Sequence, residues 1–106
     1  MDTSFCLVLT TCPDKDSAHT VAHSLIEGRL AACVSILPPI TSIYRWQGKI
    51  ESNEELMLLI KTKNSQFSAI KEQILDVHPY ELPEIISVPI SNGLDQYLRW
   101  VADNVS

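Results

Sequence analysis

The amino-acid sequence predicts an α+β fold in a single domain that spans residues 1–106. Segments of strand type and of helix type alternate along the chain, and no linker or repeat separates them. Apolar residues make up 45% of the chain, which is enough for one small core. The predicted order is strand, helix, strand, strand, helix, strand, followed by a short terminal helix.

The first strand is expected at residues 5–11, a short apolar run that ends before Pro13. A helix follows, with Asp14 as its N-cap and Gly28 near its end. Apolar residues at helical spacing form its predicted buried stripe, which consists of Ala18, Val21, Ala22, Leu25 and Ile26.

Residues 32–46 are rich in β-branched and aromatic side chains, which predicts an extended segment with a bend at Pro38 and Pro39. Gln47 and Gly48 then form a tight turn, and residues 49–63 return as the third strand. A strand of about 14 residues spans roughly 45 Å, whereas a globule of this size has a radius of gyration of about 13 Å. The hairpin is therefore expected to protrude from the domain.

The tip of this hairpin is expected to reach a neighbouring subunit. Tyr44 and Trp46 lie there, and aromatic side chains are favoured as interface anchors. In the alternative, the hairpin twists back onto its own body and Trp46 is an ordinary core residue.

Asn64 or Ser65 is expected to cap a second helix. Its predicted buried stripe consists of Phe67, Ile70, Ile74 and Val77. A proline-rich joint at residues 78–84 leads to the fourth strand at residues 84–91. After a turn at Asn92 and Gly93, the final helix presents Leu94, Tyr97, Leu98 and Val101.

This order of elements is the ferredoxin-like arrangement. Because crossovers between parallel strands are right-handed, the antiparallel sheet should have the strand order 4-1-3-2, with both main helices on one face. Residues 5–9 and 56–60 are apolar at consecutive positions, so both faces of these strands should be covered. Two helices cover one face only, which indicates that the domain does not work alone.

The charge and composition exclude several classes of partner. The net charge is −5, with only eight Lys and Arg spread along the chain, which argues against nucleic-acid binding. No apolar run approaches the ~20 residues of a membrane span. Three cysteines without paired spacing fit reduced thiols, and residues 1–4 lack the basic start of a signal peptide. These features predict a cytoplasmic protein.

The sequence also predicts that the protein is not an enzyme. With three glycines in the whole chain, no glycine-rich phosphate loop can be assembled. No nucleophile-elbow pattern surrounds a serine. An acylphosphatase-like use of this fold would need an arginine in a glycine-flanked anion loop near the N-terminus, and the sequence has none.

The joint at residues 78–84 carries an imidazole, a phenol and two carboxylates around two prolines. The predicted topology brings the end of the first strand to the same edge as this joint, so Cys12, His78 and Glu84 can approach one another. A thiolate, an imidazole and a carboxylate suit Zn(II) or Cu(II). Cys33 begins the second strand at the opposite end and can join only through another subunit.

Structural roles for these four residues remain open beside the metal hypothesis. His78 can satisfy the C-terminus of the second helix, where an imidazolium is favoured by the helix dipole. Glu84 can pair with a lysine, and buried cysteines behave as small apolar residues. His19 and His23 are i and i+4 on the first helix, a spacing that can chelate a metal, although on an exposed helix adventitious ions are the ordinary expectation.

Taken together, an ordered set of short motifs resembles the CutA family of divalent-cation tolerance proteins. The motifs are Leu30-Ala31-Ala32-Cys33, residues 42–51, Ile60-Lys61-Thr62, His78-Pro79-Tyr80 and Pro83-Glu84. The resemblance implies a ferredoxin-like subunit in a homotrimer whose sheets pack around the threefold axis, similar in architecture to PII signalling proteins. It also implies a cytoplasmic location in bacteria and an association with copper and other divalent ions.

The resemblance transfers to the metal residues only in part. His78 matches the family members thought to bind copper, and Cys33 and Glu84 fall on shared positions. Val77 stands where those members have a second histidine, and Thr10 stands where they have a cysteine. The expected function is therefore weak binding of Cu(II) or another divalent cation, in a protein that needs no metal for folding.

A PII-like sensor is the alternative function. It would bind a small anionic ligand at the cleft between subunits, with Lys61, Lys49, Tyr80 and Arg45 as the candidate contacts. The ordinary interpretation of Lys61 is an ion pair between subunits.

Overall fold

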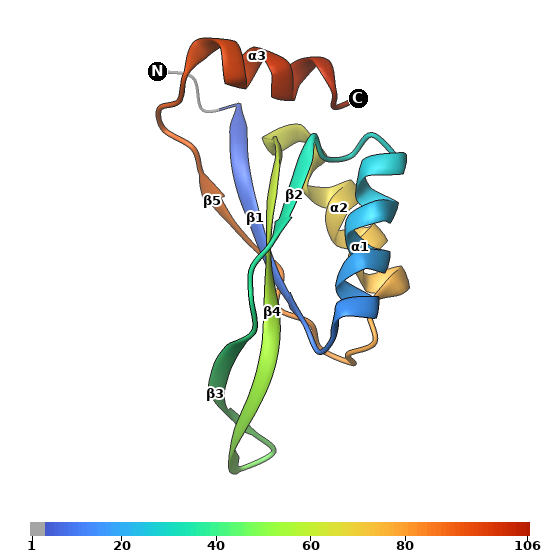
Figure 1. Ribbon diagram of the computed structural model, residues 1–106, viewed down its shortest axis with the longest axis vertical. Coiled ribbons are helices and arrows are strands. Elements are labelled where there is room, and N and C mark those ends of the chain that lie inside the picture. The colour runs from blue at the N-terminus through green and yellow to red at the C-terminus, as the bar shows by residue number, and fades with distance from the viewer. Residues whose placement is uncertain (1–3) are drawn as a thin grey trace.

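A five-stranded antiparallel sheet with two helices on one face forms the body of the protein (Figure 1). This computed structural model describes residues 4–106; residues 1–3, on which the expected lack of a signal peptide partly depends, lie outside them. The elements in chain order are β1 (Phe5–Cys12), α1 (Lys15–Glu27), β2 (Cys33–Ile36), β3 (Ile40–Trp46), β4 (Lys49–Lys63), a 3₁₀ turn (Asn64–Gln66), α2 (Phe67–Val77), β5 (Ile86–Pro89) and α3 (Asp95–Asp103). Within residues 4–106, no helix has the length and apolar character needed to cross a membrane.

The strand path through the sheet is β2-β4-β1-β5, and β3 pairs with the distal half of β4. Every pairing is antiparallel. The predicted α+β class, the antiparallel sheet and the C-terminal helix are confirmed. The four predicted strands correspond to β1, to β2 with β3, to β4 and to β5.

Alternate residues of the central strands face the two helices and form the core. Residues buried between the sheet and α1 and α2 include Cys6, Val8, Cys12, Val21, Leu25, Leu58, Ile60, Ile70 and Ile74. Asp14 is the N-cap of α1 as predicted, and its Oδ1 accepts a hydrogen bond of 2.8 Å from the backbone N–H of Ser17. Ile26 was expected in the buried stripe of α1, but this is wrong: its side chain is 41% exposed.

The opposite face of the sheet is only partly covered within the chain. Helix α3 lies across one end of the sheet (Figure 1), where Phe5, Val101 and Val105 form a small buried cluster. Beyond it, Leu7 and Leu59 remain half-buried, while the β5 residues Ile86 and Val88 and the α3 residues Leu94, Tyr97 and Trp100 are exposed. An apolar sheet face is thus left open along most of its length.

The second predicted strand is interrupted at its two prolines. The backbone N–H of Leu37 still donates to the carbonyl of Met57 at 2.9 Å, but Pro38 and Pro39 have no N–H to continue the ladder. Consequently β2 ends at Ile36 and β3 begins at Ile40.

Two further boundaries differ from the prediction. Asn64 and Ser65 do not cap α2, because they lie in the 3₁₀ turn and α2 begins at Phe67 without a side-chain cap. The backbone N–H of Asn64 instead donates to the carbonyl of Ser4. The fourth predicted strand is shorter than expected: it pairs with β1 over Ile86–Pro89, and residues 84, 85, 90 and 91 lie outside the strand.

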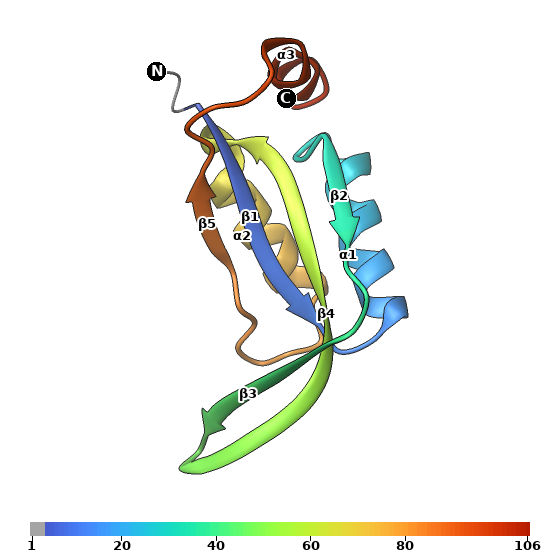
Figure 2. The same ribbon diagram turned by 60° about the vertical axis from the view of Figure 1, so that its left-hand side comes forward.

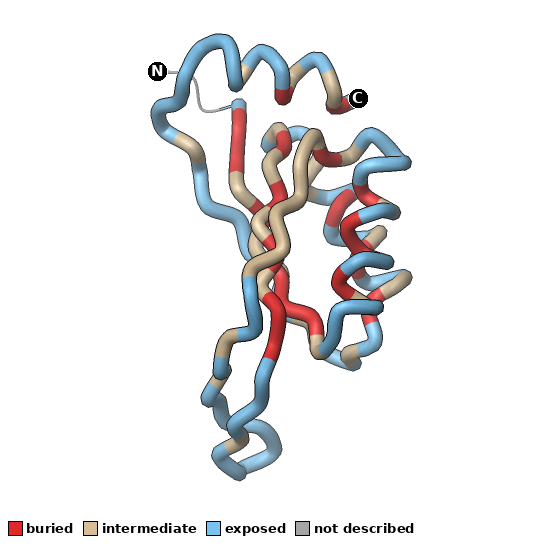
Figure 3. The backbone as a smooth tube through the Cα atoms, viewed as in Figure 1, coloured by how far each residue is buried: buried red, intermediate tan, exposed pale blue. Residues whose placement is uncertain are grey.

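The β3–β4 hairpin projects away from the two-layer body and curves as it does so (Figure 2). Its tip is a tight turn in which Gln47 and Gly48 both have positive φ, 50° and 81°, as a type I′ turn requires. The hairpin is exposed along most of its length (Figure 3), with Ile43 at 72% and Ile50 at 70%. The predicted protrusion is confirmed, and the extents of 44 × 26 × 24 Å reflect it.

We expect Ile74→Ala to lower the free energy of unfolding by about 2–5 kcal/mol, because it leaves a cavity in the core. Leu75, its neighbour on α2, provides the control because it is 50% exposed, whereas Ile74 is fully buried. Leu75→Ala should cost less than about 1 kcal/mol. Urea denaturation at one protein concentration measures both, and equal losses would contradict this assignment of the core.

Candidate functional site

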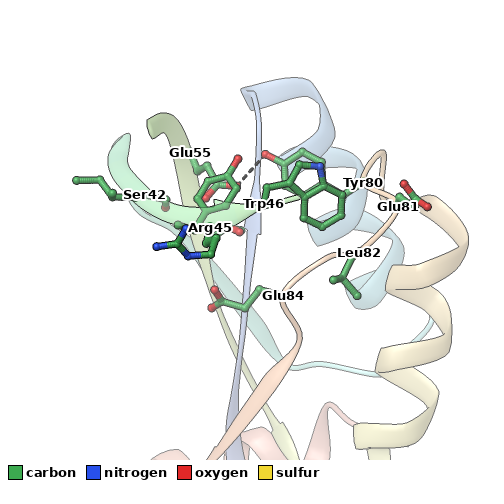
Figure 4. Close-up of a pocket in the computed structure, with 11 residues that line it drawn as sticks. Ser42, Arg45, Trp46, Glu55, Tyr80, Glu81, Leu82 and Glu84 are labelled. Atoms are coloured by element: carbon green, nitrogen blue, oxygen red, sulfur yellow. Dashed lines mark hydrogen bonds between the residues drawn. The ribbon is translucent and has the colours of Figure 1, made fainter. Parts of the chain in front are cut away.

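A cavity of about 650 Å³ opens between the curved hairpin and the joint that follows α2 (Figure 4). We call it the hairpin pocket. It is lined by Thr11, Ser42, Ile43, Tyr44, Arg45, Trp46, Glu55, Tyr80, Glu81, Leu82 and Glu84. The prolines of the joint explain why this wall keeps its shape, since each proline restricts both its own φ and the residue before it.

The charged groups of the hairpin pocket favour a cation. Glu55, Glu81 and Glu84 contribute three carboxylates, and Arg45 contributes the single guanidinium among the lining residues. The aromatic faces around them can also attract a positive charge. An anionic ligand would meet an excess of negative charge here.

Glu55 is the most deeply buried of these carboxylates, with 6% of its surface exposed. Its Oε2 accepts a hydrogen bond of 2.7 Å from the hydroxyl of Tyr80 (Figure 4). Burial raises the pKa of Tyr80, and the hydrogen bond to Glu55 raises it further. The phenol therefore remains a donor, and it ties the joint to β4.

His78 is not among the residues that line the pocket; 8% of its surface is exposed, and both of its ring nitrogens are engaged. Nδ1 accepts a hydrogen bond of 3.0 Å from the backbone N–H of Tyr80, and Nε2 lies 2.7 Å from the carbonyl oxygen of Thr11. A backbone donor on one nitrogen and a carbonyl acceptor on the other fix the proton at Nε2. A metal ion could bind either nitrogen only by displacing one of these contacts.

Cys12 and His78 are brought together, as the sequence predicts. The sulfur of Cys12 lies 3.8 Å from Nε2 of His78 and is buried in the core. Burial raises the pKa of the Cys12 thiol to about 11. Because metals bind the thiolate, this environment weakens Cys12 as a ligand.

The other predicted metal residues lie apart from this pair. Glu84 lines the hairpin pocket, while Cys33 lies on β2 beside Lys61, whose Nζ is 3.7 Å from the cysteine sulfur. In the part of the chain that the structure describes, no three His, Cys, Asp or Glu side chains gather closely enough to hold a metal ion. Thr10 is buried, and its hydroxyl has no hydrogen-bond partner among the described residues.

The predicted anion contacts are also divided. Tyr80 and Arg45 line the hairpin pocket, but Lys49 and Lys61 do not. Lys61 is half-buried on the open sheet face and donates to the hydroxyl of Ser35. The four residues therefore do not form one site within a single subunit.

Tyr44 and Trp46, the predicted interface residues, both lie on the hairpin side of the pocket. The Tyr44 hydroxyl accepts a hydrogen bond of 2.6 Å from Nδ2 of Asn53 across the hairpin. Trp46 is 37% exposed, so it is not the ordinary core residue of the alternative interpretation.

Sequence reasoning missed Glu55, which is the buried partner of Tyr80. Its only signal is its position directly before the apolar run Leu56–Ile60, on the same strand face as Met57 and Leu59. Nothing in the sequence pairs it with a tyrosine 25 residues away.

Tyr80→Phe should lower the free energy of unfolding by about 1–3 kcal/mol, because the buried Glu55 carboxylate loses its donor. Tyr44→Phe is the matched control, since its hydroxyl bonds to Asn53 on the exposed hairpin, and it should cost under about 0.5 kcal/mol.

The pH dependence follows from the raised pKa of Tyr80. The contribution of the Tyr80 phenol to the free energy of unfolding is fully present below about pH 10, the ordinary phenol pKa. It is lost as the pH rises above that value. Urea denaturation from pH 7 to 11 should show the difference between wild type and Tyr80→Phe shrinking only above that value. A difference that is absent at pH 7 would refute the role of the bond.

The sequence and the fold are similar to those of known proteins. Residues 6–104 match the family described as CutA1 divalent ion tolerance protein. The chain is 48% identical to the divalent-cation tolerance protein CutA of Thermus thermophilus, over 92% of this chain and 95% of that protein. It is 50% identical to a CutA homolog of Xenopus laevis, over 90% of this chain but only 63% of that longer protein.

The solved structure of the divalent cation tolerance protein (Cut A1) from Thermus thermophilus superimposes with a TM-score of 0.94 at 46% identity, covering 96% of this chain and 99% of that one. The family match and these identities extend over nearly the whole sequence, through both helices, the hairpin and the joint. The chain therefore belongs to the CutA1 family of divalent ion tolerance proteins.

Proposed function

We propose that this protein acts in tolerance of, or response to, copper and other divalent metal ions as a non-enzymatic, cytoplasmic homotrimer that binds Cu(II) or another divalent cation weakly. The observation that carries the proposal is the charge of the hairpin pocket, whose lining includes three carboxylates and one guanidinium. Carboxylate oxygens bind divalent ions, and together with an imidazole nitrogen such as that of His78 they suit Cu(II), which leads the order of affinities.

The proposed ligand set explains why binding is weak. Glu84 offers a carboxylate in the pocket, whereas His78 must give up a hydrogen bond and Cys12 must lose a proton that its burial retains. Cys33 would contribute only from another subunit. A protein of this design folds without metal, because its core forms from apolar side chains.

The homotrimer is supported by the open sheet face and by the hairpin. Apolar residues at consecutive positions of β1 and β4 leave one face without a covering layer beyond α3. Tyr44 and Trp46 on the protruding hairpin are the proposed contacts with the next subunit. All three cysteines are free, which fits a reducing compartment such as the cytoplasm.

A PII-like sensor of a small anion is the second candidate, and Lys61 is the observation in its favour. The half-buried ammonium group of Lys61 contacts the hydroxyl of Ser35 and the sulfur of Cys33 on the open sheet face. An anionic ligand or a carboxylate from another subunit would neutralise this charge. The negative charge of the hairpin pocket, however, favours the cation function.

Copper titration tests the proposed ligands. In a background with His19→Ala and His23→Ala, Glu84→Gln and His78→Ala should each raise the Kd for Cu(II) at least about tenfold, equivalent to ~1.4 kcal/mol. Calorimetry measures the affinity, and circular dichroism checks that the buried His78 change leaves the protein folded. Glu72→Gln, which removes an exposed carboxylate of α2 outside the pocket, is the control. An unchanged Kd in both variants would overturn the proposed site.

The assembly gives a separate prediction. Trp46→Ala should raise the subunit dissociation constant at least about 30-fold, as the loss of a central aromatic anchor worth ~2 kcal/mol requires. Sedimentation equilibrium measures it, and circular dichroism should show an intact subunit. Leu75→Ala on the outer helix α2 should leave the trimer unchanged. A wild-type protein that is monomeric at micromolar concentration would contradict the proposal.

A further inference from the structure

Two histidines outside the hairpin pocket lie next to each other on the surface of α1. His19 and His23 are both exposed and lie four positions apart, which places them one above the other on the helix. Their rings are already stacked, with centroids 6.1 Å apart and an angle of 26° between the planes. The chain contains only three histidines in total, and two of them form this pair.

The spacing suits chelation of a single metal ion. With metal–nitrogen bonds of about 2.0–2.1 Å, two imidazoles on one ion have ring centroids roughly 4.5–5 Å apart. The observed rings must therefore approach by only about 1–1.5 Å, which a small change of side-chain torsions provides. Because both side chains are on the exposed surface of a regular helix, this adjustment disturbs no buried contact.

The surroundings of the pair favour a cation. Asp16 precedes His19 by three residues and Glu27 follows His23 by four, so all four side chains fall within a stripe of about 80° along the helix. Carboxylates at these positions can complete the coordination or accept a hydrogen bond from the second ring nitrogen.

A shallow groove borders the histidines on the side of β2. It measures about 270 Å³, and its remaining lining is apolar: Ala22, Ile26, Val34 and Ile36. An apolar shell restricts the access of water to one side of a bound ion. Ile26, which is 41% exposed, is one of these lining residues.

We propose that α1 carries a surface site for a divalent transition-metal ion, with Cu(II) preferred, in which the imidazoles of His19 and His23 are the two protein ligands. Water and the carboxylates of Asp16 or Glu27 complete the coordination, consistent with the lack of any preformed three-residue cluster in residues 4–106. The preference for Cu(II) follows from the order of divalent metal affinities for imidazole. The site shares no residue with the hairpin pocket and does not depend on the function proposed for it.

NMR of the imidazole ring protons tests the site directly, because only three histidines contribute signals. On addition of CuCl₂ below one equivalent per chain, the signals of His19 and His23 should broaden together and before those of His78. ZnCl₂, as a diamagnetic probe, should shift the same two sets of signals. Broadening of one of the two alone, or of His78 first, would overturn the chelate.

Matched variants distinguish chelation by both histidines from adventitious binding to a single histidine. His19→Ala and His23→Ala should each raise the Kd for Cu(II) at least about tenfold, and the double variant should be little weaker than either, since one imidazole cannot chelate. His23→Ala combined with Thr20→His keeps the number of histidines but places them on adjacent positions, which point in different directions on the helix. If this relocated pair binds as tightly as the wild type, the site is adventitious and the proposal fails.

The outcome is independent of the hairpin pocket. His78→Ala should leave the affinity of the α1 site for Cu(II) unchanged. If the hairpin pocket binds no metal, the signals of His19 and His23 should still broaden. Failure of one proposal can thus be distinguished from failure of the other.

Discussion

The antiparallel ladder between β1 and β4 is the constraint on which the remaining structure depends. Its register, from Phe5 opposite Lys63 to Cys12 opposite Leu56, places the same face of both strands against the two helices. β1 has eight residues and β4 has fifteen, so the first half of β4 extends beyond its partner. That half pairs with β3 alone, which is why the hairpin leaves the body and why a pocket forms at its base.

The end of this ladder also determines the chemistry of the pocket. Glu55 is the first residue of β4 beyond the last pair with β1, and it is the residue that receives the hydrogen bond of Tyr80. At the same edge, the carbonyl of Thr11 holds His78 at the end of α2. Two hydrogen bonds therefore fasten the residues that follow α2 to β1 and to β4. Both bonds come from the proline-rich joint, through His78 and Tyr80.

Local patterns predicted the elements because each has a local physical cause: apolar and β-branched runs in the strands, an aspartate cap at Asp14 and a Gln-Gly turn whose two φ values are positive. The pattern failed where a tertiary contact decides. Ile26 has helical spacing, but it lines the groove beside β2 and not the core. Asn64 is a good cap residue, but it lies in the 3₁₀ turn before α2, where its N–H donates to the carbonyl of Ser4. The pairing of Tyr80 with Glu55 was likewise invisible, since no periodicity links two residues on different elements.

The contrast between the two histidine environments bears on how a cation would act on this protein. At His78, coordination would have to displace the carbonyl of Thr11 or the N–H of Tyr80, so binding there and rearrangement of the joint are thermodynamically linked. At His19 and His23, no such contact must be broken, and binding would stabilise the helix without altering the pocket. Weak affinity at the joint is then the expected property of a site that responds by changing shape, while the pair on α1 would hold its ion without such a response.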